Sequence, residues 1–518
     1  MIKNSQEDRK SAARKQVIPL QNAEKIEALL GTLQGYSRKL ASGPNEKAAR
    51  GILRIRFLVS RFVFICFSFE LSQEYAEKLL SDFESCFRMN VEYQLWKNCF
   101  YSPIEVLRKR SEDGGPHTGL FKGSLNELIE PAITFYEGLL KDYEVKFSVD
   151  FSKFYQPYAS SLSLDKFDEC AVIDSELPVV DSMVLRSAQR LIICFADLYR
   201  YKALSTHKEA RTYSFAKSLY WQAHFLEPLN GHPFNQLAVI ACYEKKWVDV
   251  LFYYIRALSV LLPFKSARES LELALNSLRQ PAITYEKWVF ELIEIENRNI
   301  QAATNNYESG PYSEILNKEN KFHNVCREIW FHPSNDVLAE ESLKKHQPVR
   351  STIEGTLTRL FVGDNGNNVQ KKAICHLLHC AGVLISTIGL DQFKQSYDLI
   401  INELLALVDN DDTVLTPAYL LKIIILYTFP IHSPKPDASQ VLFENQRCAA
   451  FELVFSSLKF LLEIFYKDMD KVGLFILTGQ LSEKFSCIIP SICFLVFWLY
   501  RIDKCLILDD VLKTLSNI

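Results

Sequence analysis

Glycine and proline are scarce in this chain of 518 residues, which contains 18 glycines and 19 prolines. Together they make up about 7% of the sequence, whereas average usage gives about 12%. All-β sandwiches, barrels and linker-dominated chains need more of these turn residues. The scarcity therefore excludes those classes and favours long, uninterrupted helices.

A strong net charge and a membrane-length apolar run are also missing. The 59 basic and 62 acidic residues leave a net charge of −3, which gives no general attraction for nucleic acid or anionic membranes. The most apolar stretch, residues 485–500, is shorter than the roughly 20 residues of a bilayer span. With 48% hydrophobic residues the chain can bury a large core. We expect a folded protein without membrane contact, and direct binding of nucleic acid is not expected.

Signatures of enzymes are absent as well. The sequence has no Walker loop, dinucleotide-binding glycine motif, nucleophile elbow or kinase motif. One cluster of potential metal ligands consists of Cys375, His376, His379 and Cys380. On a helix these four residues occupy two faces about 100° apart, so they cannot converge on one tetrahedral ion. A buried pair of side chains is the better interpretation, and we expect no catalytic residue, no metal and no cofactor.

The 13 cysteines are odd in number, irregularly spaced and mostly placed in apolar runs. This pattern is typical of reduced thiols inside the cell rather than of a disulfide framework. The polar N-terminus has no apolar segment of a secretory signal. We predict a disordered tail over residues 1–15 and a cytoplasmic location, with shuttling to the nucleus as an additional expectation.

Apolar residues recur at intervals of three and four along most of the chain, which is helical periodicity. Predicted helices include residues 91–110, 182–204, 209–226 and 233–243. Polar, turn-rich segments become more frequent in the second half, so we place a domain boundary near residue 278. The sequence predicts an all-α protein with two domains, residues 16–277 and 278–518.

An internal repeat lies within the first of these domains. The spacing of the second helix of a tetratricopeptide repeat is found at Ala216, Tyr220, Ala223 and Pro228. A shift by the 34-residue period of that motif finds it again at Val250, Tyr254, Ala257 and, one residue late, Pro263. Such helical hairpins bury their apolar faces only by stacking on one another, which creates a concave surface suited to peptides.

Three runs of residues give the chain a family resemblance. Residues 195–201 (FADLYRY), 227–238 (EPLNGHPFNQLA) and 252–258 (FYYIRAL) resemble the ever-shorter-telomeres or SMG family, and residues 95–101 (LWKNCFY) match it more weakly. Members of this family are adaptors in telomere maintenance and nonsense-mediated mRNA decay. The resemblance implies a 14-3-3-like domain that contains the tetratricopeptide-type hairpins, followed by a C-terminal domain of α-helical hairpins.

The resemblance also implies a phosphopeptide site. Arg200 matches the arginine with which the family holds a phosphoserine of the decay helicase, and Tyr201 follows it as in 14-3-3 proteins. A guanidinium group suits a phosphate because it donates two parallel hydrogen bonds. The lysine that phosphoserine-binding members place in the other half of the pocket is Tyr101 here.

Two neighbouring cations could replace that lysine. At α-helical spacing Lys97, Tyr101 and Arg108 lie within about 40° of one another, so Lys97 or Arg108 could supply the missing charge. The sequence around Pro103 also resembles a helix start, which would break the helix between them.

Asn235, in the second of the three runs, has two interpretations of equal weight. Its amide could bind a peptide backbone from the concave side of the repeat, because an amide both donates and accepts hydrogen bonds. Alternatively, Asn235 could only stabilise the tight turn at residues 231–233.

Tyr101 and the Trp96-Lys97 pair are most similar to the SMG-five branch of the family, with the SMG-seven branch next. The resemblance implies a non-enzymatic adaptor that forms a heterodimer with an SMG-seven-type paralogue and engages the phosphorylated decay helicase. It would promote mRNA decay and helicase dephosphorylation through phosphatase or decay factors. The alternatives are a structural scaffold with a degenerate phosphate pocket and a telomerase-associated nucleic-acid-binding protein. The nuclease-type domain that usually ends the SMG-five branch is not visible after Leu515, so either the chain is truncated or this form lacks it.

Overall fold

The computed structural model describes helices almost throughout. It covers residues 24–112, 117–151, 182–308, 352–432 and 440–501, apart from gaps at 41, 43–46, 207–209, 364, 392, 410–413 and 468–482. The predicted tail, residues 1–15, lies outside the described residues. Within the described ranges there is no strand, only an isolated bridge between Asn230 and Leu262. The prediction of an all-α protein is confirmed.

The chain divides into two compact units. Unit 1 comprises residues Met1–Ile240 and Arg256–Phe264, and unit 2 comprises Ala241–Ile255 and Lys265–Ile518. The predicted boundary at residue 278 falls inside one long helix, α11 (Ala267–Glu308). The division into domains 16–277 and 278–518 therefore stays a prediction.

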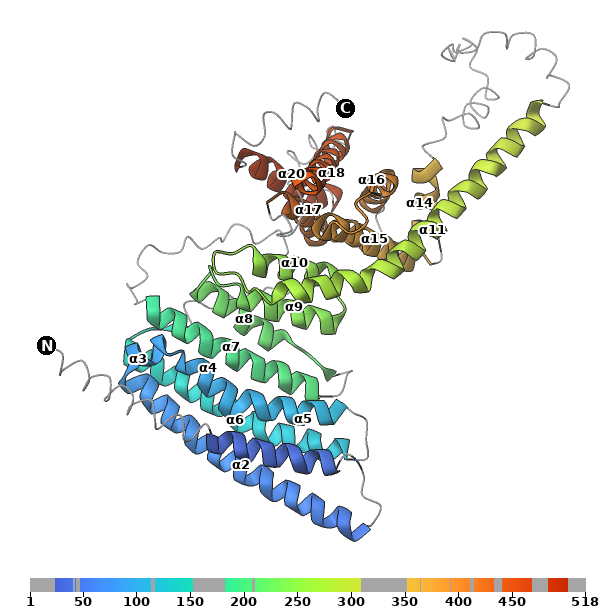
Figure 1. Cartoon of the computed structure of the whole chain (residues 1–518). Coiled ribbons are helices and arrows are strands. Elements are labelled where there is room, and N and C mark those ends of the chain that lie inside the picture. Colours follow the sequence, from blue (N-terminus) through green and yellow to red (C-terminus); the bar gives the residue numbers. More distant parts are fainter. Residues whose placement is uncertain are drawn as a thin grey trace. The chain divides into compact units, whose positions relative to one another are not determined.

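Unit 1 is an array of long helices (Figure 1). A helix over residues 24–40 is followed by α2 (Lys47–Ser81), α3 (Phe83–Arg88), α4 (Val91–Leu95), η1 (Trp96–Tyr101), α5 (Ser102–Glu112), α6 (Thr118–Phe147), α7 (Ser182–Ser205) and α8 (Ser214–Leu226). Helix α6 packs against α2, α5 and α7, and α7 packs against α8. Aromatic side chains fill the space between them; Phe57 and Phe121 meet edge to face at 5.3 Å between ring centroids. Burial of these large apolar groups is the main stabilising contribution.

The helix that carries Lys97 and Arg108 does not break at Pro103. It passes from α4 through one π-helical segment, η1, directly into α5. Proline lacks an N–H and its ring crowds the carbonyl four residues earlier, here that of Cys99, so the helix widens just before it. The hydroxyl of Ser68 on α2 donates to that carbonyl instead. The expected break is therefore wrong, because a side chain from another helix takes over the hydrogen bond that proline cannot make.

The predicted repeat helices are present as α8, α9 (His232–Glu244) and α10 (Trp247–Leu258). The residues that carry the repeat spacing are buried: Ala216, Tyr220, Ala223, Val250, Tyr254 and Ala257. The turn before α9 is closed by Gly231, whose N–H donates to the carbonyl of Leu262. A Cβ atom at Gly231 would lie 2.1 Å from the carbonyl oxygen of Ala257, so only glycine fits.

Unit 2 contains α11, α14 (Thr352–Val362), α15 (Gly366–Ser386), α16 (Phe393–Asp409), α17 (Pro417–His432), α18 (Gln440–Lys467) and α20 (Glu483–Arg501). Helix α11 packs against α15, and α17 packs against α15, α18 and α20. None of the helices in the described residues combines the length and the apolarity that a membrane span requires. The apolar stretch 485–500 lies within α20, where Ile488, Leu495 and Trp498 are buried.

Candidate functional site

Arg200 lies in the middle of unit 1 in a buried ion pair. Its Nη2 atom is 2.9 Å from Oδ1 of Asp197, one turn earlier on α7, and its Nε atom is 3.2 Å from the same oxygen. Each side chain is 7% exposed. A spacing of three residues places both groups on the same helix face. The guanidinium is therefore held in one orientation, away from bulk water.

The carboxylate of Asp197 also accepts hydrogen bonds from two other helices. Tyr220 on α8 donates its hydroxyl to Oδ1, and Gln236 on α9 donates its amide to both oxygens at 2.9 and 3.1 Å. A buried carboxylate needs hydrogen-bond donors in place of the water that it has lost, and these side chains supply them. Asp197 thus joins α7 to α8 and α9 and fixes Arg200 at the same time.

Tyr201 connects this ion pair to α5. The guanidinium of Arg200 lies over its ring, 4.3 Å from the centroid, and its hydroxyl donates to Glu105 at 3.0 Å. Arg108 donates two hydrogen bonds of 2.9 Å to the same carboxylate and a further pair to Glu112. Burial opposes the charge of Glu105, but the bonds from Arg108 and Tyr201 hold the pKa of this carboxyl below its usual value. Arg108 is thus part of the site and is already paired.

Tyr101 stands beside these charges, whereas Lys97 does not join them. The pKa of the Tyr101 phenol is raised by partial burial and by the carboxylates of Glu105 and Asp197. Lys97 is exposed, and no hydrogen bond or ion pair joins its side chain to any residue in the described part of unit 1. A π-helix takes one more residue per turn, which rotates the preceding residues by about 100° relative to α5. The α-helical spacing that placed Lys97 with Arg108 therefore does not hold through η1.

Asn235 and His232 bring α9 to the same region. The pKa of His232 is lowered by burial, and the charges of Asp197 and Arg200 act on it. Residues 232, 235 and 236 lie on one helix face, so Asn235 neighbours the two residues that approach the ion pair. Asn235 is 9% exposed, and its side-chain amide makes no hydrogen bond to any residue that the structure describes. The turn is instead held by Asn230, which accepts from the His232 N–H and donates to Gln189.

The charges of the site do not balance in favour of an anion. Two guanidinium groups, Arg200 and Arg108, face three carboxylates, Asp197, Glu105 and Glu112. A phosphate would therefore enter a site whose cations already have partners. Because the position expected for a lysine carries the neutral Tyr101, the site has one positive charge less than a complete phosphoserine pocket.

Sequence reasoning identified the cations of this site but missed most of their partners. Asp197 stood in the run that includes Arg200 and, at a spacing of three residues, is the expected helical partner of an arginine. Glu105 could have been found in the same way from Arg108. Gln236, Tyr220 and His232 carry no such signal, because only packing of α8 and α9 brings them to Asp197.

The Cys375 to Cys380 cluster in unit 2 forms a buried pair. His376 and Cys380 lie 3.5 Å apart, and the Nδ1 atom of His376 is 2.8 Å from Oε2 of the buried Glu403. Burial opposes the charge of His376, but Cys380, Glu403 and Glu286 raise its pKa above the usual value. Nowhere in the described residues do three such side chains form a group that could hold a metal ion. The predicted buried pair is confirmed.

Comparison with known protein families matches two adjacent segments of the chain. Residues 90–206, which include Arg108 and Arg200, match the family model described as telomerase activating protein Est1. Residues 216–289, from α8 into α11, match the model described as Est1 DNA/RNA binding domain. Over these two segments the chain is similar to the Est1/SMG family. The resemblance in the three residue runs is confirmed.

Curated relatives in this family are similar over part of their length. The telomerase-binding protein EST1A of Danio rerio is 27% identical over 367 residues, which cover 70% of this chain and 22% of that protein. The nonsense-mediated mRNA decay factor SMG7 of Danio rerio is 27% identical over 40% of this chain and 17% of its own length. SMG7 of Arabidopsis thaliana is 27% identical over 42% of this chain and 21% of its own length. The chain spans about a fifth of the length of these relatives.

Solved structures of the family align over most of the chain with low scores. A structure of Est1 and Cdc13 gives a TM-score of 0.47 with 13% identity and covers 84% of this chain and 71% of that one. The C. elegans SMG5-SMG7 complex gives 0.38 with 10% identity and covers 85% and 77%.

Proposed function

We propose that this chain is a non-enzymatic adaptor of nonsense-mediated mRNA decay that engages the phosphorylated decay helicase through Arg200 and pairs with an SMG-seven-type paralogue. The similarity to this family and the names of the relatives support a role in mRNA decay or telomere maintenance. The observation that carries the proposal is the fixed, buried guanidinium of Arg200 against Tyr201. We further propose a cytoplasmic location with nuclear shuttling, and recruitment of phosphatase or decay factors.

Phosphate recognition would use the preset geometry of the site. Asp197 and Tyr201 hold the guanidinium, so little rotamer entropy is lost when a phosphate binds. The unbonded amide of Asn235 on α9 would then hold the backbone of the bound peptide. Because Glu105 and Glu112 neutralise Arg108, we expect weaker binding than in a pocket with a free lysine.

The test compares phosphorylated and unphosphorylated helicase peptides by fluorescence polarisation. The variant Asp197→Asn/Arg200→Gln removes both charges together, so that no unpaired charge is left in the core. We expect it to lose the preference for the phosphorylated peptide. Arg186→Gln on the same helix, whose arginine pairs with Glu227 at 2.8 Å, serves as the control and should keep it. Equal affinity of the unchanged protein for both peptides would rule out phosphate reading by Arg200.

A groove between α2 and α6 supports the pairing part of the proposal. It has a volume of about 660 Å³, and its lining includes Phe69, Phe135 and Leu139. A Cβ atom at Gly138 in this groove would meet nothing within 4 Å, so the backbone of α6 is open to close approach. The charged residues of the lining, Glu130 and Asp142, are both acidic, and Glu130 is paired with Lys202 at 2.8 Å. The groove therefore fits an amphipathic helix with basic flanks, which we assign to the paralogue.

An exposed apolar stripe extends this groove along α2. Ile52, Ile55, Val59 and Phe62 are 53%, 62%, 56% and 65% exposed, and their spacing continues through residues 66 and 69 into the groove. Spacings of three and four residues form one helix face, the pattern by which helices pack in pairs. A contiguous exposed apolar surface of this kind marks a protein interface.

Mixing with the paralogue, followed by light scattering, tests the pairing. Gly138→Gln fills the groove and Phe62→Ser removes a large apolar contact, and both should abolish the complex. Val145→Ser is a matched control, because Val145 is 83% exposed on α6 but does not line the groove. If all three variants still form complexes of unchanged mass, this surface is excluded as the pairing interface.

The second candidate is a scaffold whose own phosphate pocket is degenerate, with the paralogue reading the phosphate. The excess of carboxylates over guanidinium groups and the neutral Tyr101 favour it. In that case the complex forms normally, while the isolated chain binds both helicase peptides alike. The two experiments above therefore distinguish the adaptor with a working pocket from the scaffold.

The third candidate is a nucleic-acid-binding protein, which the description of the matched model at residues 216–289 favours. This segment holds eight lysines and arginines against six acidic residues, so it has little electrostatic attraction for a phosphate backbone. A titration with single-stranded RNA and DNA at two salt concentrations tests it. Binding that weakens steeply with salt would favour this candidate over the adaptor.

A further inference from the structure

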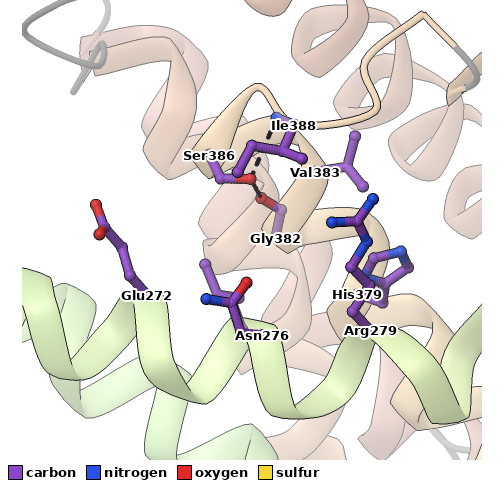
Figure 2. Close-up of a pocket in the computed structure, with 9 residues that line it drawn as sticks. Glu272, Asn276, Arg279, His379, Gly382, Val383, Ser386 and Ile388 are labelled. Carbon is purple, nitrogen blue, oxygen red and sulfur yellow. Dashed lines mark hydrogen bonds between the residues drawn. The ribbon is translucent and has the colours of Figure 1, made fainter.

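A small cavity with both polar and apolar lining residues lies in unit 2, between α11 and α15, far along the sequence from Arg200. Its volume is about 90 Å³, enough for about three water molecules at roughly 30 Å³ each. Figure 2 shows Arg279 and His379 side by side at one end, Asn276 near the middle, and Glu272 at the other end. Donor groups from two helices thus face one small space.

Of the three donors that line this cavity, Arg279 and Asn276 are exposed and His379 is half-buried. Among the residues that the structure describes, the side chains of Arg279, His379 and Asn276 make no hydrogen bond and no ion pair. This differs from the Arg200 site, where both arginines are neutralised by carboxylates. A guanidinium, an imidazole and an amide that converge on one space, with no acceptor among the described residues, are arranged as in an anion site.

The charges around the cavity agree with this arrangement. The pKa of His379 is lowered to about 4 by burial and by the positive charges of His376 and Arg279, against the opposing effect of the Glu286 carboxylate, so the ring is neutral at pH 7 and keeps one N–H donor. Glu286 is hydrogen-bonded to Ser396 and lies two turns from Arg279 along α11, about 10 Å away. Glu272 is as far from Arg279 in the other direction, so neither carboxylate is expected to neutralise the guanidinium.

The end of α15 next to the cavity does not repel an anion strongly. Free carbonyl groups at a helix C-terminus would carry partial negative charge. Here the Gly382 carbonyl accepts from the Ser386 hydroxyl at 2.7 Å, and the Val383 carbonyl accepts from the Thr387 N–H at 2.8 Å. Glycine at 382 also allows α11 to come close, since a Cβ atom there would lie 2.7 Å from Leu275.

We propose that the cavity lined by Arg279, His379 and Asn276 binds a phosphate monoester or free phosphate, as a second anion site that is independent of Arg200. A phosphate group presents three terminal oxygens, which match three donor side chains better than the two oxygens of a carboxylate. Arg279 supplies the charge, while His379 and Asn276 fix the orientation.

Isothermal titration of the full chain with inorganic phosphate tests the proposal. The Asp197→Asn/Arg200→Gln background removes the other candidate site, so failure of one site does not obscure the other. In this background we expect saturable binding that Arg279→Gln weakens by about tenfold or more. Arg298→Gln is the matched control, because Arg298 lies on the same helix but pairs with Glu294 in solvent.

If the titration with inorganic phosphate gives no heat of binding, the second site is ruled out. Equal affinities of Arg279→Gln and Arg298→Gln for phosphate would also rule it out. A phosphoserine peptide titrated in the same background identifies the source of the anion. Tighter binding of the peptide than of inorganic phosphate assigns the site to a phosphorylated protein, and equal binding assigns it to the free ion.

Discussion

Arg200 and Asp197 form an ion pair of 2.9 Å in which each side chain is 7% exposed. A pair this deeply buried depends on both partners, because the remaining charge has no water to solvate it. The same geometry that fixes the guanidinium in one orientation therefore makes the site sensitive to any change of Asp197.

Removal of one charge of this pair should destabilise unit 1 strongly. We expect Asp197→Ala to lower the free energy of unfolding by about 3 to 5 kcal/mol, since it leaves the Arg200 guanidinium buried without a partner. Glu294→Ala breaks a helical pair with Arg298 that is about 70% exposed, and should cost less than about 1 kcal/mol. Urea unfolding measures both, and equal midpoints for the two variants would contradict the role assigned to Asp197.

Gly231 should tolerate no side chain. Because a Cβ atom would lie 2.1 Å from the carbonyl oxygen of Ala257, Gly231→Ala forces the turn before α9 apart and should cost about 1 to 3 kcal/mol. Gly123 on α6 meets nothing within 4 Å of its Cβ position. Gly123→Ala should therefore raise stability by up to about 1 kcal/mol through helix propensity. Thermal unfolding of the two variants should shift in opposite directions.

Ser68 and Pro103 should be coupled although they lie on different helices. Ser68→Ala leaves the buried Cys99 carbonyl without a donor and should cost about 1 to 3 kcal/mol. Pro103→Ala restores an N–H at the position four residues after that carbonyl, so the cost of Ser68→Ala should fall in this background. A double-mutant cycle by urea unfolding measures the coupling, and additive effects would contradict it.

The imidazole of His224 should make stability depend on pH. Burial, together with the charge of Arg256, lowers its pKa to about 4 from the usual 6.5. The unfolded chain therefore binds a proton between pH 6.5 and pH 4 that the folded chain excludes, and stability falls as the pH drops through this window. Above pH 6.5 the contribution is fully present. His224→Gln should flatten this slope in urea unfolding measured at several pH values, and an unchanged slope would exclude His224 as its origin.

Much of the fold could be predicted from local pattern. Helices α7, α8, α9 and α10 follow from apolar spacing, and the repeat residues at 216, 220 and 223 are buried as expected. The helix through Pro103 could not be predicted, because its continuity depends on a hydroxyl from α2. The local sequence shows that Pro103 removes a hydrogen bond from the helix, but it does not show that Ser68 replaces that bond.

The candidate site shows the same division. Arg200 and its neighbour Tyr201 could be identified from the sequence, whereas Asp197 was missed although its spacing of three residues from Arg200 could have revealed it. The exclusion of Lys97 from the site could not be predicted, because the π-helical segment changes the angle between Lys97 and α5. The free donors at Arg279 and His379 could not be foreseen either, since they come from helices about 100 residues apart.

By itself the sequence determined that this protein is helical, that it is similar to the Est1/SMG family and that Arg200 is a candidate site residue. These properties depend on spacing and on short runs of residues, which are local. Only the tertiary structure decided that this arginine is paired with Asp197, that Lys97 does not join the site, and that Arg279, His379 and Asn276 line one cavity. Charge balance in a site depends on side chains from several helices, and packing alone brings these together.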